Sequence, residues 1–188
     1  MAYMNQNEMQ DMGFKSLGNN VKISTKASIY NCDQIEIGDN SRIDDFCVIS
    51  GTIQIGRYVH LTPMCLVAGG EKGVVISDYV TMAYGVKVFS QSDDYSGQTM
   101  TNSMIPKKYK NEYKSRVVLE KYSIIGAGSI IMPGIIIAEG ASIGAMSLVT
   151  KDIEPWSINV GVPARKIKNR SKDLLNLVTQ FVKDNDPI

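Results

Sequence analysis

A six-residue repeat constrains the fold of this chain more than any other feature of its sequence. Large apolar residues recur at every sixth position in four blocks, which two short slips and one long interruption separate. An amphipathic helix would repeat at about 3.6 residues, and a doubly wound α/β fold would need helical stretches between its strands. Neither pattern occurs before residue 170. The in-frame residues are Leu17, Ile23 and Ile29; Ile37, Ile43, Ile49, Ile55 and Leu61; Ile76, Met82 and Val88; and Leu119, Ile125, Ile131, Ile137, Ile143 and Val149.

This period predicts a mainly β fold in which three six-residue sides close one triangular coil of about eighteen residues. Stacked coils would bury a column of apolar side chains and pair their strands in parallel. Small residues such as Ser41, Ser123 and Ala141 recur four positions after the in-frame residue, where they would fit a tight corner. Glycines such as Gly38 and Gly126 follow the in-frame residue directly, and we expect them to tolerate the turn conformation there.

Two segments interrupt the repeat, and a third follows it. The glycine-rich residues 68–73 predict a bulge, and the polar residues 93–116 predict an extended loop of the kind that is usually functional or disordered. Apolar residues between about 171 and 183 are spaced for an amphipathic helix, with Ser171 as its cap. We therefore expect a β-helix domain over residues 1–170, with the loop at 93–116, and a C-terminal helix and tail over residues 171–188.

Composition excludes several classes of function and location. Twenty basic and nineteen acidic residues give a net charge of +1, which argues against nucleic-acid binding driven by charge. Three cysteines, an odd number without a CxxC motif, favour a reducing compartment. No signal peptide is visible, and the longest apolar run, residues 130–138, is too short to insert into a membrane. We expect a cytoplasmic protein.

The repeat blocks LGNNVKISTKAS, IGDNSRIDDFCV and IGAGSIIMPGIIIAEGASIGAMSL resemble the hexapeptide-repeat acyltransferases. The tail VTKDIEPWSINVGVPARKIK is similar to the C-terminal signature of their sugar acetyltransferase branch, which includes the maltose and galactoside acetyltransferases. This resemblance covers roughly residues 15–170. It implies a left-handed parallel β-helix, an exception to the usual crossover rule. It also implies acetyl-CoA as co-substrate and a homotrimer with active sites between its subunits.

The same resemblance suggests catalytic and acceptor-binding residues. In the maltose and galactoside enzymes the base is a histidine at the start of the long loop, and Asp93 occupies that position here. The only histidine, His60, aligns with a tyrosine that contacts the acceptor, and Thr62 aligns with an acceptor-binding asparagine. His60 is our candidate base or acceptor-orienting group, with Asp93 assisting it and Asp94 binding substrate. The alternatives are that His60 is an ordinary surface residue and that the two aspartates are a solvated loop start.

The candidate acetyl-CoA residues also follow from the resemblance. Ala127 and Ala145 lie where backbone groups meet the pantetheine arm, and Lys151, Arg165 and Lys168 lie where basic residues meet the phosphates. The lysines could instead be ordinary surface residues. No metal site is expected, because a single histidine rules out the three-histidine zinc site of the γ-class carbonic anhydrases, which share this fold.

The departure at Asp93 affects the expected acceptor. A sugar hydroxyl is a poor nucleophile that needs a base, whereas a neutral sugar amine attacks a thioester with less help. We therefore expect acetylation of an amino group. The resemblance to enzymes that prepare O-antigen and capsule sugars implies that the acceptor is a dTDP- or UDP-linked amino-deoxysugar for O-antigen or other surface-polysaccharide synthesis, including lipopolysaccharide. The alternatives are O-acetylation of a polysaccharide or oligosaccharide, an antibiotic-modifying acetyltransferase, and a non-catalytic trimeric scaffold.

Overall fold

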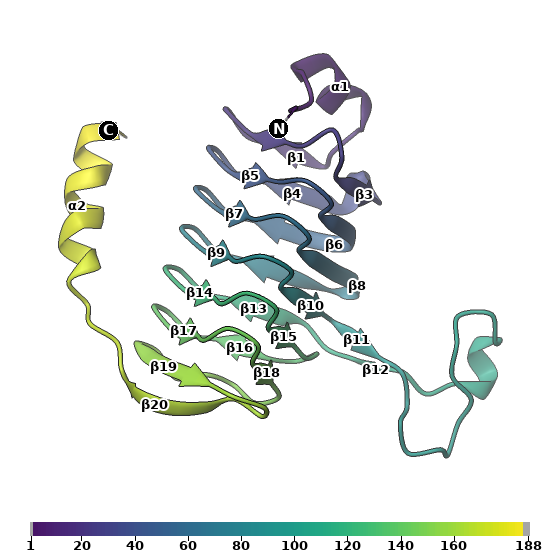
Figure 1. Cartoon of the computed structure of the whole chain (residues 1–188). Coiled ribbons are helices and arrows are strands. Elements are labelled where there is room, and N and C mark those ends of the chain that lie inside the picture. The colour runs from purple at the N-terminus through teal and green to yellow at the C-terminus, as the bar shows by residue number, and fades with distance from the viewer. Residues whose placement is uncertain (1, 186–188) are drawn as a thin grey trace.

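The computed structural model describes residues 2–185, which form a three-sided prism of stacked coils (Figure 1). The first side holds β1 (Ser16–Leu17), β4 (Ile35–Ile37), the ends of β6 (Val48–Ile55) and β8 (Leu66–Ile76), β13 (Val117–Leu119) and β16 (Ile136–Ile137). The second side holds β2 (Lys22–Ile23), β5 (Arg42–Ile43), β7 (His60–Leu61), β9 (Thr81–Met82), β14 (Ile124–Ile125), β17 (Ser142–Ile143) and β19 (Ser157–Val160). The third side holds β3 (Ser28–Tyr30), the starts of β6 and β8, β10 (Lys87–Phe89), β15 (Ile130–Ile131) and β18 (Leu148–Val149).

These strands pair in parallel from coil to coil, so equivalent apolar residues stack in columns. On the second side, Ile43 pairs with Leu61, Leu61 with Met82 and Met82 with Ile125. All in-frame residues are buried except Leu17 and Ile29 in the first coil, which are partly buried. Burial of each such side chain contributes about 1.5–3 kcal/mol. The predicted left-handed parallel β-helix of hexapeptide repeats is confirmed.

Most corners turn at the third position after the in-frame residue. That position has a left-handed backbone in coil after coil, with φ of 58° at Asn40 and 62° at Tyr79. We expected Gly38 and Gly126 to tolerate the turn conformation, and this expectation was wrong, because neither glycine has a left-handed backbone. They are needed for stacking instead, since a Cβ at Gly126 would lie 2.5 Å from the backbone nitrogen of Ala145 in the next coil.

The three corners of the prism differ in what they carry. The first corner, between the first and second sides, carries a stack of aromatic rings. The second corner, between the second and third sides, carries exposed apolar side chains. The third corner carries every long insertion: η1 (Cys32–Gln34), the glycine-rich bulge within β8, and the loop between β11 (Gln91–Ser92) and β12 (Tyr113–Lys114), which includes η2 (Lys107–Tyr109). That loop projects away from the prism (Figure 1).

Two helices and an antiparallel strand complete the described chain. Helix α1 (Gln6–Asp11) lies at the N-terminal end, and β20 (Arg165–Asn169) runs antiparallel to β19 at the other end. Helix α2 (Leu174–Asn185) runs back along the prism (Figure 1), beginning and ending slightly later than the residues 171–183 expected. The end of the expected tail, residues 186–188, lies outside the described residues. No helix within residues 2–185 is long and apolar enough to cross a membrane.

Candidate active site

The loop at the third corner leaves the prism on a short antiparallel stem, and cavities surround that stem. Gln91 and Ser92 of β11 pair with Lys114 and Tyr113 of β12. A cavity of about 550 Å³ on one side of the stem is lined by Ser92, Tyr113, Met132, Pro133, Gly134, Ile135, Thr150, Lys151 and Asp152. A second, of about 350 Å³, is lined by Ser50, Ala68, Gly70, Phe89, Gln91, Ser92, Asp93, Ser103 and Glu112.

Ion pairs fix the base of this loop to the glycine-rich bulge. Lys114 Nζ lies 3.2 Å from Glu71 in the bulge and 3.2 Å from Glu112 in the loop. Glu112 also pairs with Lys110 at 2.9 Å, where the lysine side chain is almost fully covered. Hydrogen bonds to Glu71 and then Glu112 raise the pKa of Lys114. The bulge predicted at residues 68–73 thus supplies an anchor for the loop.

The adjacent aspartates Asp93 and Asp94 have different surroundings. Asp94 accepts hydrogen bonds from the backbone nitrogens of Ser96 at 2.8 Å and Thr99 at 3.1 Å, and from the Thr99 hydroxyl at 2.9 Å. Hydrogen bonds from Ser96 and then from Thr99 lower the pKa of Asp94 to about 2. Asp93 is exposed and borders the second cavity. Asp94 therefore holds the turn, and Asp93 presents its carboxylate beside the cavity.

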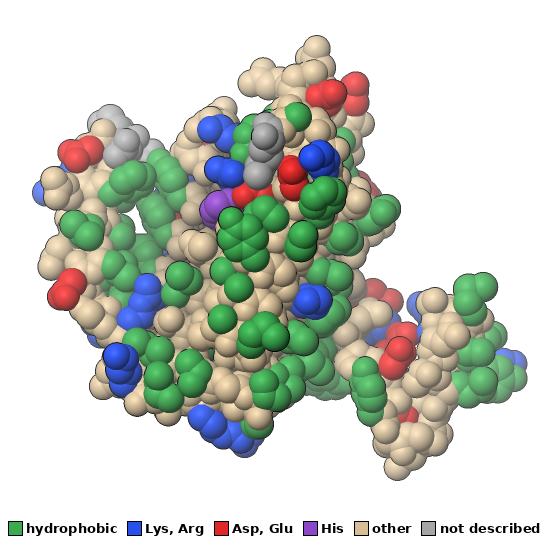
Figure 2. Space-filling model, in the orientation of Figure 1, with side chains coloured by type: hydrophobic (Ala, Val, Ile, Leu, Met, Phe, Trp, Pro, Cys, Tyr) green, Lys and Arg blue, Asp and Glu red, His purple; other side chains and the backbone are tan. Residues whose placement is uncertain are grey.

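His60 belongs to a separate cluster on the second side of the prism. Its Nε2 lies 2.9 Å from Oδ2 of Asp44, whose side chain is only 3% exposed. Arg42 donates to the same carboxylate, from Nε to Oδ1 at 2.6 Å and from Nη2 to Oδ2 at 3.2 Å. Arg42 and His60 are register partners on β5 and β7, and Asp44 follows β5 directly. The histidine keeps 37% of its side chain exposed (purple in Figure 2).

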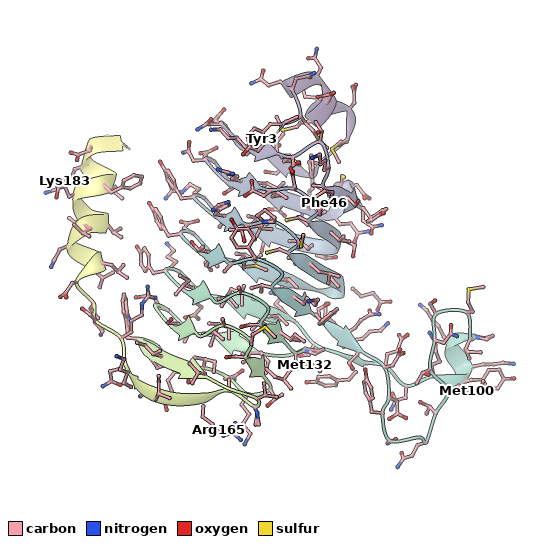
Figure 3. The ribbon with its side chains drawn as sticks, in the orientation of Figure 1. Tyr3, Phe46, Met100, Met132, Arg165 and Lys183 are labelled. Carbon is pink, nitrogen blue, oxygen red and sulfur yellow. The ribbon has the colours of Figure 1, made fainter. Side chains whose placement is uncertain are left out.

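The second corner continues below this cluster as a ladder of equivalent positions. Tyr84, Ala127 and Ala145 occupy the same place in successive coils, joined by bonds from Gly128 N to Tyr84 O and from Met146 N to Ala127 O, both 2.8 Å. Apolar side chains are exposed along this corner: Phe46, Met64, Tyr84 and Met146. Arg165 lies at the base of the prism, far from Tyr3 and Phe46 at its N-terminal end (Figure 3).

The structure brings some of the sequence-predicted residues together and separates others. Ala127 and Ala145 share the second corner. The last coil ends below that corner, where Leu148 N donates to Gly161 O. Arg165 follows this end of the last coil, at the start of β20. Lys151 lies apart from them, in the cavity at the loop stem. Lys168 is exposed on β20, opposite Ile158.

His60 and Asp93 do not meet within one chain, because one is on the second side and the other lies beyond the third corner. Thr62 is buried, and its hydroxyl donates to the carbonyl of Met82 at 3.0 Å. Sequence reasoning missed Asp44 and Arg42. A signal was present, since both flank the in-frame residue Ile43 and therefore share the outer face of the second side with His60. Among residues 2–185, no three side chains of the metal-binding types lie close enough to hold an ion.

Comparison with known proteins places these features among acyltransferases. The chain is 47% identical over 184 residues to a dTDP-4-amino-4,6-dideoxy-D-glucose acyltransferase from Escherichia coli, covering 96% of this chain and 95% of that protein. A chloramphenicol acetyltransferase from Klebsiella aerogenes is 57% identical over only 49 residues, 26% of this chain and 23% of that protein. No family model matches the chain.

Solved structures also match the chain over nearly all of its length. The N-acyltransferase AntD from Bacillus cereus, in a variant solved with dTDP-4-amino-4,6-dideoxyglucose and coenzyme A, has a TM-score of 0.96 and 44% identity. The match covers 97% of this chain and 98% of AntD's. AntD has also been solved with dTDP and 3-hydroxybutyryl-CoA, again with 44% identity and a TM-score of 0.95.

Proposed function

The chain belongs to the hexapeptide-repeat acyltransferases that modify dTDP-linked amino sugars, and on this premise we propose that it acetylates the 4-amino group of a dTDP-4-amino-4,6-dideoxy sugar. The observation that carries the proposal is the match to such enzymes along 96–97% of the chain. The short match to the chloramphenicol enzyme gives no comparable support to an antibiotic acceptor.

The reaction is a direct acyl transfer. The amine nitrogen forms a bond to the thioester carbonyl carbon of acetyl-CoA, and the carbon–sulfur bond breaks. One amine proton passes to a base and then to the leaving sulfur, so the products are the N-acetyl sugar and the free thiol of CoA. The chain supplies two groups that can accept the proton, the exposed carboxylate of Asp93 and the partly exposed ring of His60, whose Nε2 contacts Asp44.

We assign acetyl-CoA to the second corner. Exposed apolar side chains there, including Met146, offer contacts for the pantetheine arm, and the backbone at Ala127 and Ala145 can be approached closely because both side chains are small. Arg165 at the base would bind phosphate, since its guanidinium presents several donors in a fixed plane. The thioester would then lie near Tyr84, with the acceptor's nucleotide extending toward the upper coils.

We further propose a homotrimer in which each active site forms between two neighbouring subunits. The separation of His60 from Asp93 within one chain supports this assembly, because the loop projects outward from its own prism (Figure 1) and can reach a neighbour. Exposed apolar side chains at Met64 and Tyr84 would be covered by such a neighbour. Lys151 and Lys168 remain candidates for CoA contacts, and Thr62 and Asp94 remain candidates for acceptor contacts.

A cytoplasmic location fits the substrates, and so do the free cysteines Cys32, Cys47 and Cys65. The product would serve surface-polysaccharide synthesis such as that of lipopolysaccharide.

The proposal is tested by following thiol release with acetyl-CoA and dTDP-4-amino-4,6-dideoxyglucose. Turnover with this amine, and none with the corresponding dTDP-glucose, is the expected result. Turnover with the hydroxyl sugar alone would instead establish O-acetylation. Titration calorimetry with CoA separates both outcomes from a non-catalytic scaffold, which would bind no CoA. A parallel assay with 3-hydroxybutyryl-CoA tests whether the acyl group is acetyl.

A further inference from the structure

We propose that Asp44 is a positioning residue that keeps the ring proton of His60 on Nε2, so that Nδ1 is left as the proton acceptor of the active site. This inference rests on the proposed acetyl transfer.

The position of Asp44 in the repeat is unusual. It directly follows an in-frame residue of the second side, where the other coils have small or uncharged residues. The equivalent residues are Ser24, Thr62, Ala83, Gly126 and Gly144. A carboxylate that is 97% covered is costly unless it is paired and hydrogen-bonded, so the fold alone gives no reason to place one here.

The partners of Asp44 fix the direction of its hydrogen bonds. Arg42 is only a donor, so both carboxylate oxygens act as acceptors toward it, at 2.6 Å and 3.2 Å. The remaining contact, 2.9 Å from Oδ2 to His60 Nε2, is then satisfied when the histidine donates. A neutral imidazole that donates from Nε2 has an unprotonated Nδ1, which can accept a proton.

The surroundings of the cluster are consistent with a binding surface. The Tyr3 ring lies 5.6 Å from the Arg42 guanidinium, and Tyr84 at the second corner is close enough to act electrostatically on Arg42. Tyr84 is also the residue at which the ladder of Ala127 and Ala145 begins. A proton acceptor on the outer face of β7 therefore lies one coil above the place that we assign to the thioester.

The Asp44→Asn variant tests the inference because it changes hydrogen bonding with little change in shape. The shorter bond, from Arg42 Nε at 2.6 Å, holds the amide oxygen on its side. The amide NH₂ then takes the place of Oδ2, where it gives up the 3.2 Å bond from Arg42 Nη2 and faces His60. The imidazole would then have to accept at Nε2 and carry its proton on Nδ1, which removes the acceptor. A buried aspartate that sets a histidine tautomer has this effect in serine proteases, where the same replacement lowers kcat by about 10⁴-fold.

The readout is the nitrogen NMR spectrum of the full-length enzyme labelled with ¹⁵N-histidine, in which one imidazole gives all signals because the chain has one histidine. We expect an unprotonated Nδ1 in the wild type and a protonated Nδ1 in Asp44→Asn. We also expect kcat/KM for the amino sugar to fall at least ~100-fold in the variant, with unchanged CoA affinity.

Asp78→Asn is the matched control, because Asp78 pairs with Arg57 and Lys121 at the first corner, away from His60. It should keep both the wild-type spectrum and the wild-type activity. If Asp44→Asn does not fold, Asp44→Glu and the wild-type spectrum still decide the question. Asp44→Glu keeps a carboxylate, so it should have a ring protonated on Nε2 and part of the wild-type activity.

Two results would overturn the inference while leaving the acetyl transfer intact. One is a wild-type ring with its proton on Nδ1. The other is kinetic: Asp44→Asn does not act through His60, because it either leaves kcat/KM normal or lowers it by the same factor in wild-type and His60→Gln enzymes. In the proposed arrangement the two changes act on the same group, so the double variant should be no less active than His60→Gln alone. Failure of the wild type to turn over any amino sugar would instead contradict the proposed function.

Discussion

The ring of Tyr79 lies face to face with the ring of Tyr58, with centroids 5.2 Å apart and planes within 3° of parallel. Tyr122 in the next coil continues the stack, with its centroid 5.4 Å from that of Tyr79. Phe181 of helix α2 lies edge-on to both Tyr58 and Tyr79. Since equivalent corner positions recur once per coil, the repeat itself builds this stack, and the helix docks on it.

Removal of the Phe181 ring should release helix α2 from the prism. Each aromatic pair contributes about 0.5–1.5 kcal/mol beyond area burial. Phe181→Ala removes two such pairs, so the docking of helix α2 should lose about 1–3 kcal/mol of free energy. We expect faster hydrogen exchange across residues 174–185 and little change within the coils. Leu177→Ala is the control, because Leu177 is 68% exposed on the same helix. Unchanged exchange in the helix of Phe181→Ala would show that other contacts hold α2 in place.

Coil stacking should be far more sensitive to a methyl group at Gly126 than at Gly85. A Cβ at Gly126 would lie 2.5 Å from the nitrogen of Ala145, and backbone in a stacked coil cannot move aside cheaply. A Cβ at Gly85 would meet nothing within 4 Å, although its φ of 67° adds strain of about 1–2 kcal/mol. Gly126→Ala should therefore lose over ~3 kcal/mol of unfolding free energy in a denaturant titration. A larger loss for Gly85→Ala would contradict the stacking explanation.

The prism could be predicted because the pattern that specifies it is a fixed spacing along the sequence. Each coil repeats the same inward position, so the frame through Ile43, Leu61 and Met82 can be read along the chain without knowledge of distant contacts. The reason for the glycines was not predictable. Sequence shows that Gly126 recurs, but only the stacked coils show that its neighbour is the backbone of Ala145 and that the turn itself lies two residues later.

The site was harder to predict because its contacts join residues from separate coils. Asp44 and His60 are sixteen residues apart, and their hydrogen bond depends on the register of β5 against β7. Asp93 and Asp94 are adjacent and chemically identical in sequence, yet only Asp94 bonds to Ser96 and Thr99. Side-chain direction in an irregular loop has no period, so a repeat cannot reveal it.

Asp94 should titrate at unusually low pH. Its folded-state pKa of about 2 lies below the ordinary value of 3.8, because Ser96 and Thr99 donate hydrogen bonds to the ionised carboxylate. A depressed carboxylate pKa contributes stability that is fully present above about pH 4 and is lost as the pH falls through about 2. The amide signals of Ser96 and Thr99 should shift with a midpoint near 2. In Asp94→Asn this transition should be absent, and a wild-type midpoint near 4 would rule out the hydrogen-bonded turn.

Asp93 and Asp94 should respond differently to replacement at neutral pH. Asp93→Asn removes an exposed carboxylate beside the second cavity, of about 350 Å³, and we expect a fall of ~10-fold or more in kcat with the loop unchanged. Asp94→Asn weakens the turn, so we expect faster hydrogen exchange over residues 94–99. Steady-state kinetics and exchange measured on both variants separate the two effects. Equal exchange rates in both variants would contradict the division of roles between the aspartates.

Arg165 should affect acetyl-CoA without affecting the acceptor. Its side chain is exposed at the base of the second corner, where its only bond among the described residues is from Nη1 to the carbonyl of Ala164 at 2.9 Å. A lost hydrogen bond to a charged phosphate costs about 1.5–3 kcal/mol, and 1.4 kcal/mol corresponds to tenfold in affinity. Arg165→Ala should therefore raise the Kd of CoA at least ~10-fold in titration calorimetry, while the KM of the amino sugar stays constant. Lys166→Ala is the control, because Lys166 pairs with Glu154 at 2.8 Å. If the control weakens CoA binding as much as Arg165→Ala, the effect comes from general surface charge rather than from the phosphate contact assigned to Arg165.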